Sequence, residues 1–281
     1  MPITLAKCKI LCKFITTMPD SDFSLNNPPL LCVMARVEFA KIPKIKDYAV
    51  DLHESLRMKN LWEFDERKSN GIHINPNAEA GPNITYGEEA LWVITDRERK
   101  ISLRVDSESI TILFGNYNKF EQAEPLYVEV LQAIEQTIKG IVCKELQLRY
   151  INHIAQENGT GPDKWVKPAV LGMPNFEGLQ RMASVSETSY RSTLGGRLVV
   201  RCSSMPNGLT LPPDLLPFEM ESKLPLQSPT PFVLLENLHA KQAGQSAFSA
   251  TACLEEFSEM RSDIHRAFQE TATPQALEIW K

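Results

Sequence analysis

The stretch LQLRYINHI, Leu146 to Ile154, decides how the middle of this chain folds, because its residues alternate as they do in a β-strand. On that pattern one face of the strand carries Leu146, Leu148, Tyr150, Asn152 and Ile154, and the other carries Gln147, Arg149, Ile151 and His153. The first face is mostly apolar and is expected to face the core, whereas the second is mostly polar and is expected to be exposed. Asn152 is the exception on the core side, and its buried amide needs hydrogen-bond partners, commonly loop backbone at a strand end.

The residues before this strand predict a strand, a helix, a group of strands and a second helix. Leu31–Ala40 is rich in apolar and β-branched residues, as strands are, and the segment 46–60 repeats apolar residues at helical spacing. Between Leu61 and Tyr117, short alternating runs are separated by Gly, Pro, Asn, Asp and Ser, which is typical of an antiparallel meander. Helical spacing returns from Phe120 to Ile138, and Gly140 is expected to end that helix.

The residues after this strand predict further strands and a final helix. The segment 182–204 contains two alternating runs joined at Leu194, Gly195 and Gly196, where the glycines favour a tight hairpin turn. The segment 206–231 contains seven prolines, so it is either an ordered surface loop or an insertion between strands. The segment 231–242 predicts a late strand, and residues 254–268 predict an amphipathic helix that ends before Thr273 and Pro274.

This order of elements predicts an α+β fold in which an antiparallel meander sheet packs against long helices. The pattern of one strand, one helix, a meander and a long helix is followed by a shorter second set. We therefore expect two fused sheet-and-helix halves, residues 28–145 and 146–281, preceded by a poorly ordered N-terminal extension over residues 1–27.

Four stretches of the chain together resemble a known family. They are NPPLLCVMARVEFAKI, LQLRYINHI, PFVLLENLHA and LEEFSEMRSDIHRAFQETATPQALEIW. They resemble a sporadically distributed family of uncharacterised prokaryotic proteins of about 250 residues, a length that fits one or two domains. That family has a leucine-arginine-tyrosine-isoleucine-asparagine strand at mid-chain and a terminal helix followed by a threonine-rich segment that ends in tryptophan. The matching positions here are Leu148–Asn152, His265, Phe268, Thr271, Thr273 and Trp280.

The chain departs from this family in two places. The family often has a basic residue where His153 stands, and often has acidic residues in the late strand, where this chain has Glu236 and Asn237. The resemblance implies a fold and a scattered distribution of the kind seen in mobile or defence-linked genes. It implies no catalytic residue.

Composition sets broad limits on the function. Of the 281 residues, 43% are hydrophobic and 23% are charged, which is ordinary for a soluble globular protein. The net charge of −5 argues against nucleic-acid binding without excluding it, because a local basic patch is compatible with it. No apolar run is long enough to span a membrane, and the six scattered cysteines fit a reducing compartment. The expected location is therefore the cytoplasm, with no membrane contact.

No catalytic residue, metal ligand or cofactor site is predicted. The chain has no Gly-x-Ser-x-Gly motif for a serine nucleophile, and Cys143, Cys202 and Cys253 lie in or beside apolar elements, where a buried, inert thiol is the default. Cys8 and Cys12 are not followed by the second pair of ligands that a zinc site needs.

One set of residues has the composition of a metal-dependent nuclease site. Asp214, Glu221 and Lys223 supply an acid and a Glu-x-Lys pair. Their setting is a proline-rich loop, whereas oxygen ligands for a divalent ion need a fixed scaffold. We therefore treat this set as a chance match.

Two arginine-histidine pairs remain as candidate binding residues. Arg149 and His153 share a face of a strand, Arg261 and His265 share a face of a helix, and either pair could bind an anion. The expected function is a non-enzymatic binding or regulatory role through contacts with a protein partner or a second copy, in a defence-linked system. One alternative is a metal-dependent hydrolase or nuclease, and another is a small-ligand-binding protein whose sheet forms a pocket.

Overall fold

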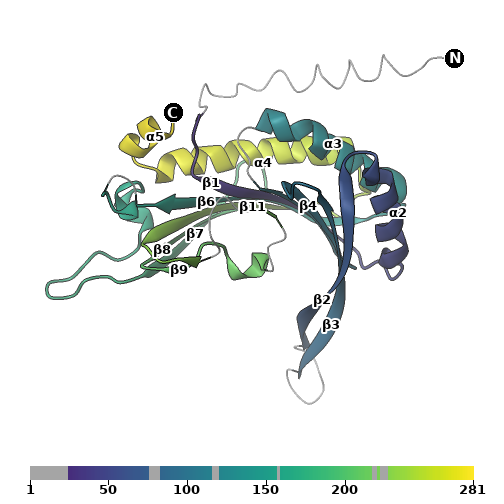
Figure 1. The fold of residues 1–281 in the computed structure, drawn as a ribbon, viewed down its shortest axis with the longest axis horizontal. Coiled ribbons are helices and arrows are strands. Elements are labelled where there is room, and N and C mark those ends of the chain that lie inside the picture. The colour runs from purple at the N-terminus through teal and green to yellow at the C-terminus, as the bar shows by residue number, and fades with distance from the viewer. Residues whose placement is uncertain (1–24, 76–82, 116–119, 157–158, 217–219, 222–226) are drawn as a thin grey trace.

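An antiparallel sheet of nine strands forms the centre of the described molecule (Figure 1). The computed structural model describes residues 25–75, 83–115, 120–156, 159–216, 220–221 and 227–281. The predictions made for residues 1–24, which include Cys8 and Cys12, and for Lys223 lie outside these ranges.

The stretch LQLRYINHI lies in β6, at the middle of this sheet. The strands are β1 (Leu30–Phe39), β2 (Leu61–Asn75), β3 (Asn83–Asp96), β4 (Ile101–Val105), β5 (Ser109–Gly115), β6 (Cys143–Ala155), β7 (Ser184–Arg191), β8 (Arg197–Met205) and β11 (Phe232–Gln242). Their order across the sheet is β2-β3-β4-β5-β1-β6-β11-β8-β7. A separate short pair is formed by β9 (Gly208–Leu209) and β10 (Gln227–Ser228). Because β6 pairs with β1 on one side and β11 on the other, both of its edges are hydrogen-bonded.

Helices cover one face of the sheet, with α3 and α4 lying across it (Figure 1). The helices are α2 (Ile45–Arg57), α3 (Phe120–Thr137), α4 (Ala250–Thr271) and α5 (Pro274–Trp280), and the 3-10 turns are η2 (Pro162–Lys164), η3 (Pro168–Val170) and η4 (Pro213–Leu215). The predicted end of the last helix before Thr273 is confirmed, but a further helix, α5, follows it. Thr273 caps α5 by accepting a hydrogen bond from Ala276 N, and Pro274 fits its first turn.

The main core lies between the sheet and these helices. Alternate residues of β1 and β6 point into it, namely Val33, Ala35, Val37, Leu146, Leu148 and Tyr150. This confirms the two faces expected for LQLRYINHI. Asn152 is buried as expected, but its Nδ2 donates to Leu235 O at 3.1 Å, so its partner is the neighbouring strand instead of a loop.

The opposite face of the sheet carries a second, smaller core. Its buried members are Leu31, Cys32, Met34, Leu113, Ile151, Leu211, Leu215, Met220, Phe232 and Leu234. Three of them come from the proline-rich segment, whose η4 turn lies on the side of the sheet away from α3 and α4 (Figure 1). The expectation that this face of β6 is exposed is therefore wrong, because described residues of the proline-rich segment cover part of it.

The mixed α/β composition and the antiparallel sheet are confirmed, whereas the meander differs in detail. Residues 61–96 were expected to form several short strands but form one long hairpin, β2–β3, because Gly71 pairs with Gly87 and the ladder continues past both. The β7–β8 turn is as expected, with φ of +93° at Gly195 and +81° at Gly196. The boundary proposed between residues 145 and 146 falls inside β6, and the division into two halves stays a prediction.

Within the described ranges, no helix is both long enough and apolar enough to cross a membrane.

Candidate functional site

Arg149 is the centre of a charged network on the face of the sheet opposite the helices. Only 5% of the residue is exposed, and its Nε donates to Glu236 Oε2 at 3.0 Å. Glu236 lies on the adjacent strand β11 and is equally buried. A buried arginine needs such a partner, because an unpaired charge inside a protein is costly. The sheet itself therefore supplies the first counter-ion of Arg149.

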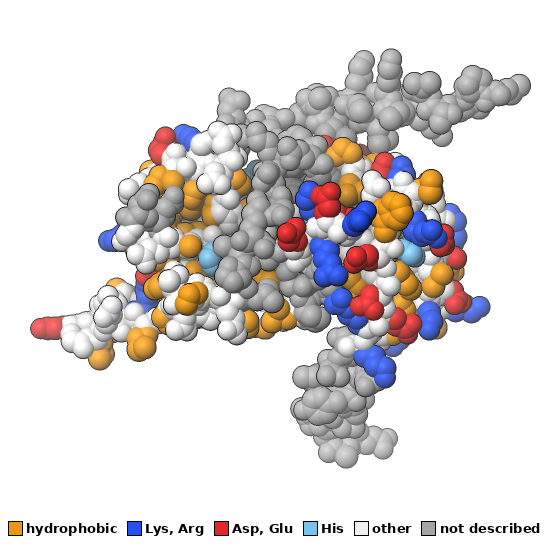
Figure 2. Space-filling model, in the orientation of Figure 1, with side chains coloured by type: hydrophobic (Ala, Val, Ile, Leu, Met, Phe, Trp, Pro, Cys, Tyr) orange, Lys and Arg blue, Asp and Glu red, His pale blue; other side chains and the backbone are white. Residues whose placement is uncertain are grey.

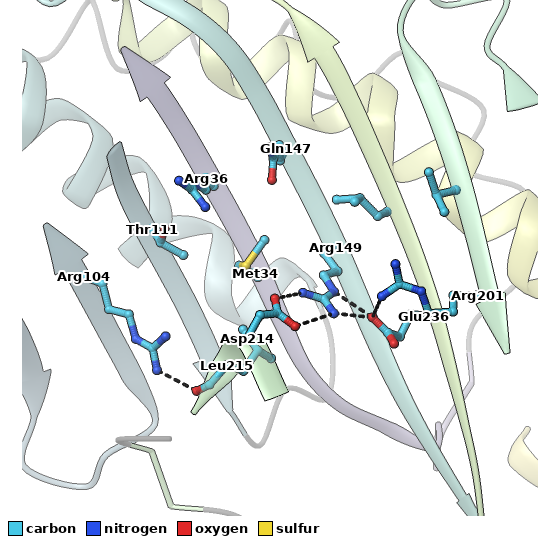
Figure 3. Close-up of a pocket in the computed structure, with 12 residues that line it drawn as sticks. Met34, Arg36, Arg104, Thr111, Gln147, Arg149, Arg201, Asp214, Leu215 and Glu236 are labelled. Carbon is cyan, nitrogen blue, oxygen red and sulfur yellow. Dashed lines mark hydrogen bonds and ion pairs between the residues drawn. The ribbon is translucent and has the colours of Figure 1, made fainter. Parts of the chain in front are cut away.

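Asp214 supplies a second counter-ion, which comes from the η4 turn instead of the sheet. Arg149 Nη1 donates to Asp214 Oδ2 at 2.6 Å, and Nη2 lies 3.4 Å from Oδ1. Partial burial tends to raise the pKa of Asp214, but the hydrogen bond and charge of Arg149 outweigh it and lower that pKa below its ordinary value. Asp214 and Glu236 thus hold the Arg149 guanidinium from opposite sides (Figure 3).

These residues line a pocket of about 350 Å³, which we call the arginine pocket. Four arginines line it, each from a different strand, namely Arg36, Arg104, Arg149 and Arg201 (Figure 3). Its other lining residues are Met34, Thr111, Gln147, Val199, Asp214, Leu215, Glu236 and Leu238. The register explains this grouping, because Arg36 pairs with both Thr111 and Gln147, and Arg104 also pairs with Thr111. Side chains of directly paired residues share a face of the sheet.

The remaining three arginines of the pocket differ in their contacts. Arg104 Nη2 donates to the backbone oxygen of Leu215 at 2.9 Å. Arg201 lies 2.7 Å from Glu187 and 3.8 Å from Glu236. Arg36 Nε lies 3.3 Å from a carboxylate oxygen of Glu38 but makes no hydrogen bond to any described residue. The pocket lining therefore holds four cationic side chains and two carboxylates.

His153 lies on the same face of β6 as Arg149 but outside the arginine pocket. It is 8% exposed, and its ring stacks on Phe232 with 5.0 Å between ring centroids. Its Nε2 has no hydrogen-bond partner among the residues described. Burial lowers the pKa of His153 below its ordinary value. His153 was expected on an exposed surface, and that expectation is wrong because the second core covers it.

Arg261 and His265 lie on α4, on the other side of the sheet. Both are half-buried, and the His265 ring meets the Tyr150 ring edge-on with 6.0 Å between centroids. Tyr150 faces the helices, whereas Arg149 faces away from them. The two predicted pairs are therefore separated by the sheet and do not form one site.

Of the residues considered for a nuclease site, the structure describes Asp214 and Glu221, and these two contact different partners. The Asp214 carboxylate contacts Arg149, and the backbone nitrogen of Glu221 donates to Arg99 O at 2.9 Å. No group of three or more His, Cys, Asp or Glu side chains in the described part of the chain is placed to hold a metal ion.

The described cysteines are free thiols, and all four are buried. Burial raises the pKa of Cys32 and of Cys202 to about 12 in each case, which makes these two thiols poor nucleophiles at neutral pH. Cys143 and Cys253 form a hydrogen bond with each other, and this bond lowers the pKa of Cys143.

A second candidate surface consists of exposed apolar side chains before and along β7. We call it the apolar edge surface, and its residues are Met173, Phe176, Leu179, Met182, Val185 and Tyr190. It flanks the free edge of β7, which pairs only with β8 in the described sheet. Val185 and Tyr190 lie on opposite faces of β7, because Tyr190 pairs with Leu198 on the helix side and Val185 pairs with Ser203 on the other side. Large exposed apolar patches mark interaction sites more often than chance.

Three pocket arginines, Arg36, Arg104 and Arg201, were not singled out from the sequence. A signal was present, because each interrupts an apolar strand at an alternating position. Sequence spacing alone does not show that four separate strands bring these positions together. The apolar edge surface also needed the structure, since exposed and buried apolar residues look alike in a sequence.

Comparison with known proteins adds no functional assignment. No protein-family model matches this chain, and no curated protein matches it. The arguments for function therefore come from the two sites described above.

Proposed function

We propose that this protein acts by binding another protein, without catalysis, through the apolar edge surface. The observation that carries this proposal is the concentration of six exposed large apolar side chains between residues 173 and 190. Burial of such side chains by a partner is favourable, at about 25 cal/mol for each Å² of apolar surface removed from water. Figure 2 shows mostly apolar and uncharged side chains at this end of the molecule and many charged side chains at the opposite end.

The two edges of the sheet differ in a way that supports the same surface. The outer strand β2 carries five charged side chains between residues 63 and 68, and such charges discourage pairing with another chain. The outer strand β7 has only Glu187 and Arg191 as charged residues. We infer that the partner contributes an extended, uncharged segment that adds a strand along β7 and packs apolar side chains against residues 173–182.

The test compares two methionines of similar exposure. Met182 is 81% exposed and lies in the apolar edge surface, whereas Met58 is 88% exposed and follows α2. We expect Met182→Lys combined with Val185→Lys to abolish retention of a stoichiometric partner in affinity purification from the native host. Met58→Lys is the matched control and is expected to leave retention unchanged.

Sedimentation of the purified chain separates the two kinds of partner. If the partner is a second copy of this chain, the wild type should form a dimer that depends on protein concentration. The Met182→Lys/Val185→Lys variant should not form this dimer. A different protein predicts a monomer that gains mass only with the captured partner. A monomer from which no partner is recovered, or a partner retained equally by the variant, would contradict the proposal.

The wider setting is part of the same proposal. The resemblance to the sporadically distributed prokaryotic family supports a role as a component of a defence-linked assembly. The four free thiols among the described residues support a reducing cytoplasm. The identity of neighbouring genes in the source genome tests the defence role, because genes of unrelated metabolism around it would argue against that role.

A small-ligand-binding function is the second candidate. The observation that favours it is the arginine pocket, whose volume of about 350 Å³ lies within the usual range for small-molecule sites. The nuclease alternative has less support, because the carboxylate of Asp214 is already engaged by Arg149.

A further inference from the structure

We propose that the arginine pocket binds a small organic dianion, either a dicarboxylate or a monophosphate ester, and that Asp214 occupies part of the binding position when no ligand is present. This inference rests on the small-ligand candidate function and is independent of the apolar edge surface. It assigns Arg36 and Arg149 as the residues that contact the anionic groups.

The η4 turn shows how the pocket already holds acceptor groups. Two successive residues of this turn each accept from a pocket arginine, Asp214 through its carboxylate from Arg149 and Leu215 through its backbone oxygen from Arg104. Arg149 and Arg104 lie on different strands, β6 and β4, and the turn bridges them (Figure 3). An anion in place of the Asp214 carboxylate would find the same donors of Arg149.

The two carboxylates on Arg149 differ in how easily they can leave. The side chain of Glu236 is 7% exposed and belongs to the sheet, so it is a permanent counter-ion. The side chain of Asp214 is 61% exposed, although it contacts a buried arginine. Rotation of this side chain toward solvent would free two donor positions of Arg149, while Leu215 could stay buried in the second core. A ligand carboxylate or phosphate would then restore the lost charge pair.

Charge and shape define the class of ligand. Four arginines and two carboxylates line the pocket, and Glu38 and Glu187 pair with Arg36 and Arg201 from outside the lining. When Asp214 rotates away, Arg149 loses one of its two carboxylates, and a ligand with two negative charges could then contact both Arg149 and Arg36. Arginine forks bind carboxylates and phosphates through two parallel hydrogen bonds. Arg36 Nε makes no hydrogen bond within the described structure, and its ion-pair partner there is Glu38 at 3.3 Å. Met34, Val199 and Leu238 add apolar walls, which suit a carbon skeleton between or beside the charged groups.

Isothermal titration calorimetry of the full chain with succinate and with glycerol 3-phosphate tests this inference, with glycerol as the uncharged control. We expect saturable binding of at least one dianion at millimolar concentrations or below, and none of glycerol. Binding of succinate alone would identify a dicarboxylate site, and binding of glycerol 3-phosphate alone would identify a phosphate-ester site. Absence of saturable binding for both probes would overturn the proposal.

Two variants locate the binding in the pocket. Arg36→Gln should weaken binding about tenfold, which is the loss of one good charged contact. Its control, Arg57→Gln, removes an equal charge from α2 and should leave the affinity unchanged. Asp214→Asn should strengthen binding several-fold, because the competing carboxylate is gone, and Glu270→Gln is its charge-matched control.

The same variants also show which result would reject the site. If Arg36→Gln and Arg57→Gln weakened ligand binding equally, the anion would be responding to the overall charge of the protein and not to the arginine pocket. Weaker binding by Asp214→Asn would mean that Asp214 supports the ligand instead of standing in its place. Melting temperatures of all four variants confirm that each is folded, and partner retention through β7 should be the same in each.

Discussion

At the scale of single residues, the two faces of β6 show how one strand serves two environments. Tyr150 packs with the helices, while Arg149, one position earlier, lies among carboxylates on the other face. The alternation in LQLRYINHI was enough to assign these faces, because neighbouring strand residues must point in opposite directions. The exposure of Arg149 was not predictable in the same way, because it depends on Asp214, which is 65 residues away along the chain.

His153 predicts a dependence of stability on pH. Its folded-state pKa is lowered from 6.5 by burial, so the unfolded chain binds the proton more readily than the folded protein does. The stabilising contribution is therefore complete above about pH 6.5 and is lost progressively as the pH falls toward the folded-state pKa. Urea denaturation between about pH 5 and 8 should show this loss in the wild type.

The His153→Phe variant is the control for this pH dependence. Phenylalanine keeps the stacking on Phe232 and has no proton to bind, so the loss of stability below about pH 6.5 should become smaller. An identical pH profile in both proteins would assign the effect to other groups.

At the scale of secondary-structure elements, the sequence was most informative where spacing is regular. The periods of α3 and α4 and the alternation of β1, β6 and β11 matched the elements closely. The sequence predicted several short strands in place of the β2–β3 hairpin, because glycine usually marks a break in a strand. In the structure Gly71 and Gly87 pair with each other and the ladder continues. The helix α5 was missed because seven residues hold too few turns to show a clear period.

The β7–β8 turn depends on Gly196 for space as well as for conformation. A Cβ atom at Gly196 would lie 2.3 Å from the backbone oxygen of Ala240, on the neighbouring strand β11. Gly178 also has positive φ, +75°, but a Cβ atom there would meet no other described part of the chain within 4 Å. Substitutions at these two glycines therefore distinguish the free-energy cost of a left-handed conformation from the added cost of a steric clash.

We expect Gly178→Ala to cost about 1 kcal/mol of unfolding free energy, which is the cost of a left-handed alanine. Gly196→Ala should cost clearly more, about 3 kcal/mol or above, because the β7–β8 hairpin must also move away from β11. Urea denaturation at neutral pH measures both values. Equal losses would show that the turn adjusts without strain.

At the scale of the whole molecule, one sheet supports two cores. The larger core lies under the helices, and the smaller one includes Leu211, Leu215 and Met220 of the proline-rich segment. Adjacent residues of the same strands enter different cores, as Tyr150 and Ile151 do. Because the strands are shared, we expect the two cores to unfold together in one cooperative transition.

Leu215→Ala tests this coupling. Leu215 is 2% exposed, and its truncation should cost about 2–5 kcal/mol, as large-to-small substitutions in cores do. Tryptophan fluorescence and circular dichroism should still report coincident urea transitions. The control Leu179→Ala lies in the apolar edge surface and should change stability by less than about 0.5 kcal/mol.

A transition at lower urea seen by only one of the two probes would indicate that the second core, or one half of the chain, unfolds alone. That result would favour the division into residues 28–145 and 146–281 as separate folding units. A single transition would favour the continuous sheet as the folding unit.

The sequence by itself determined much of the local structure of this protein, namely most of its strands outside residues 61–96, its main helices, the glycine turn and the two faces of β6. It could do so because strand alternation, helical spacing and positive φ are properties of neighbouring residues. Only the tertiary structure decided that Arg36, Arg104, Arg149 and Arg201 line one pocket, and that a proline-rich segment covers that face of the sheet. Strand order and loop packing join residues that are far apart along the chain, and no local pattern contains that information.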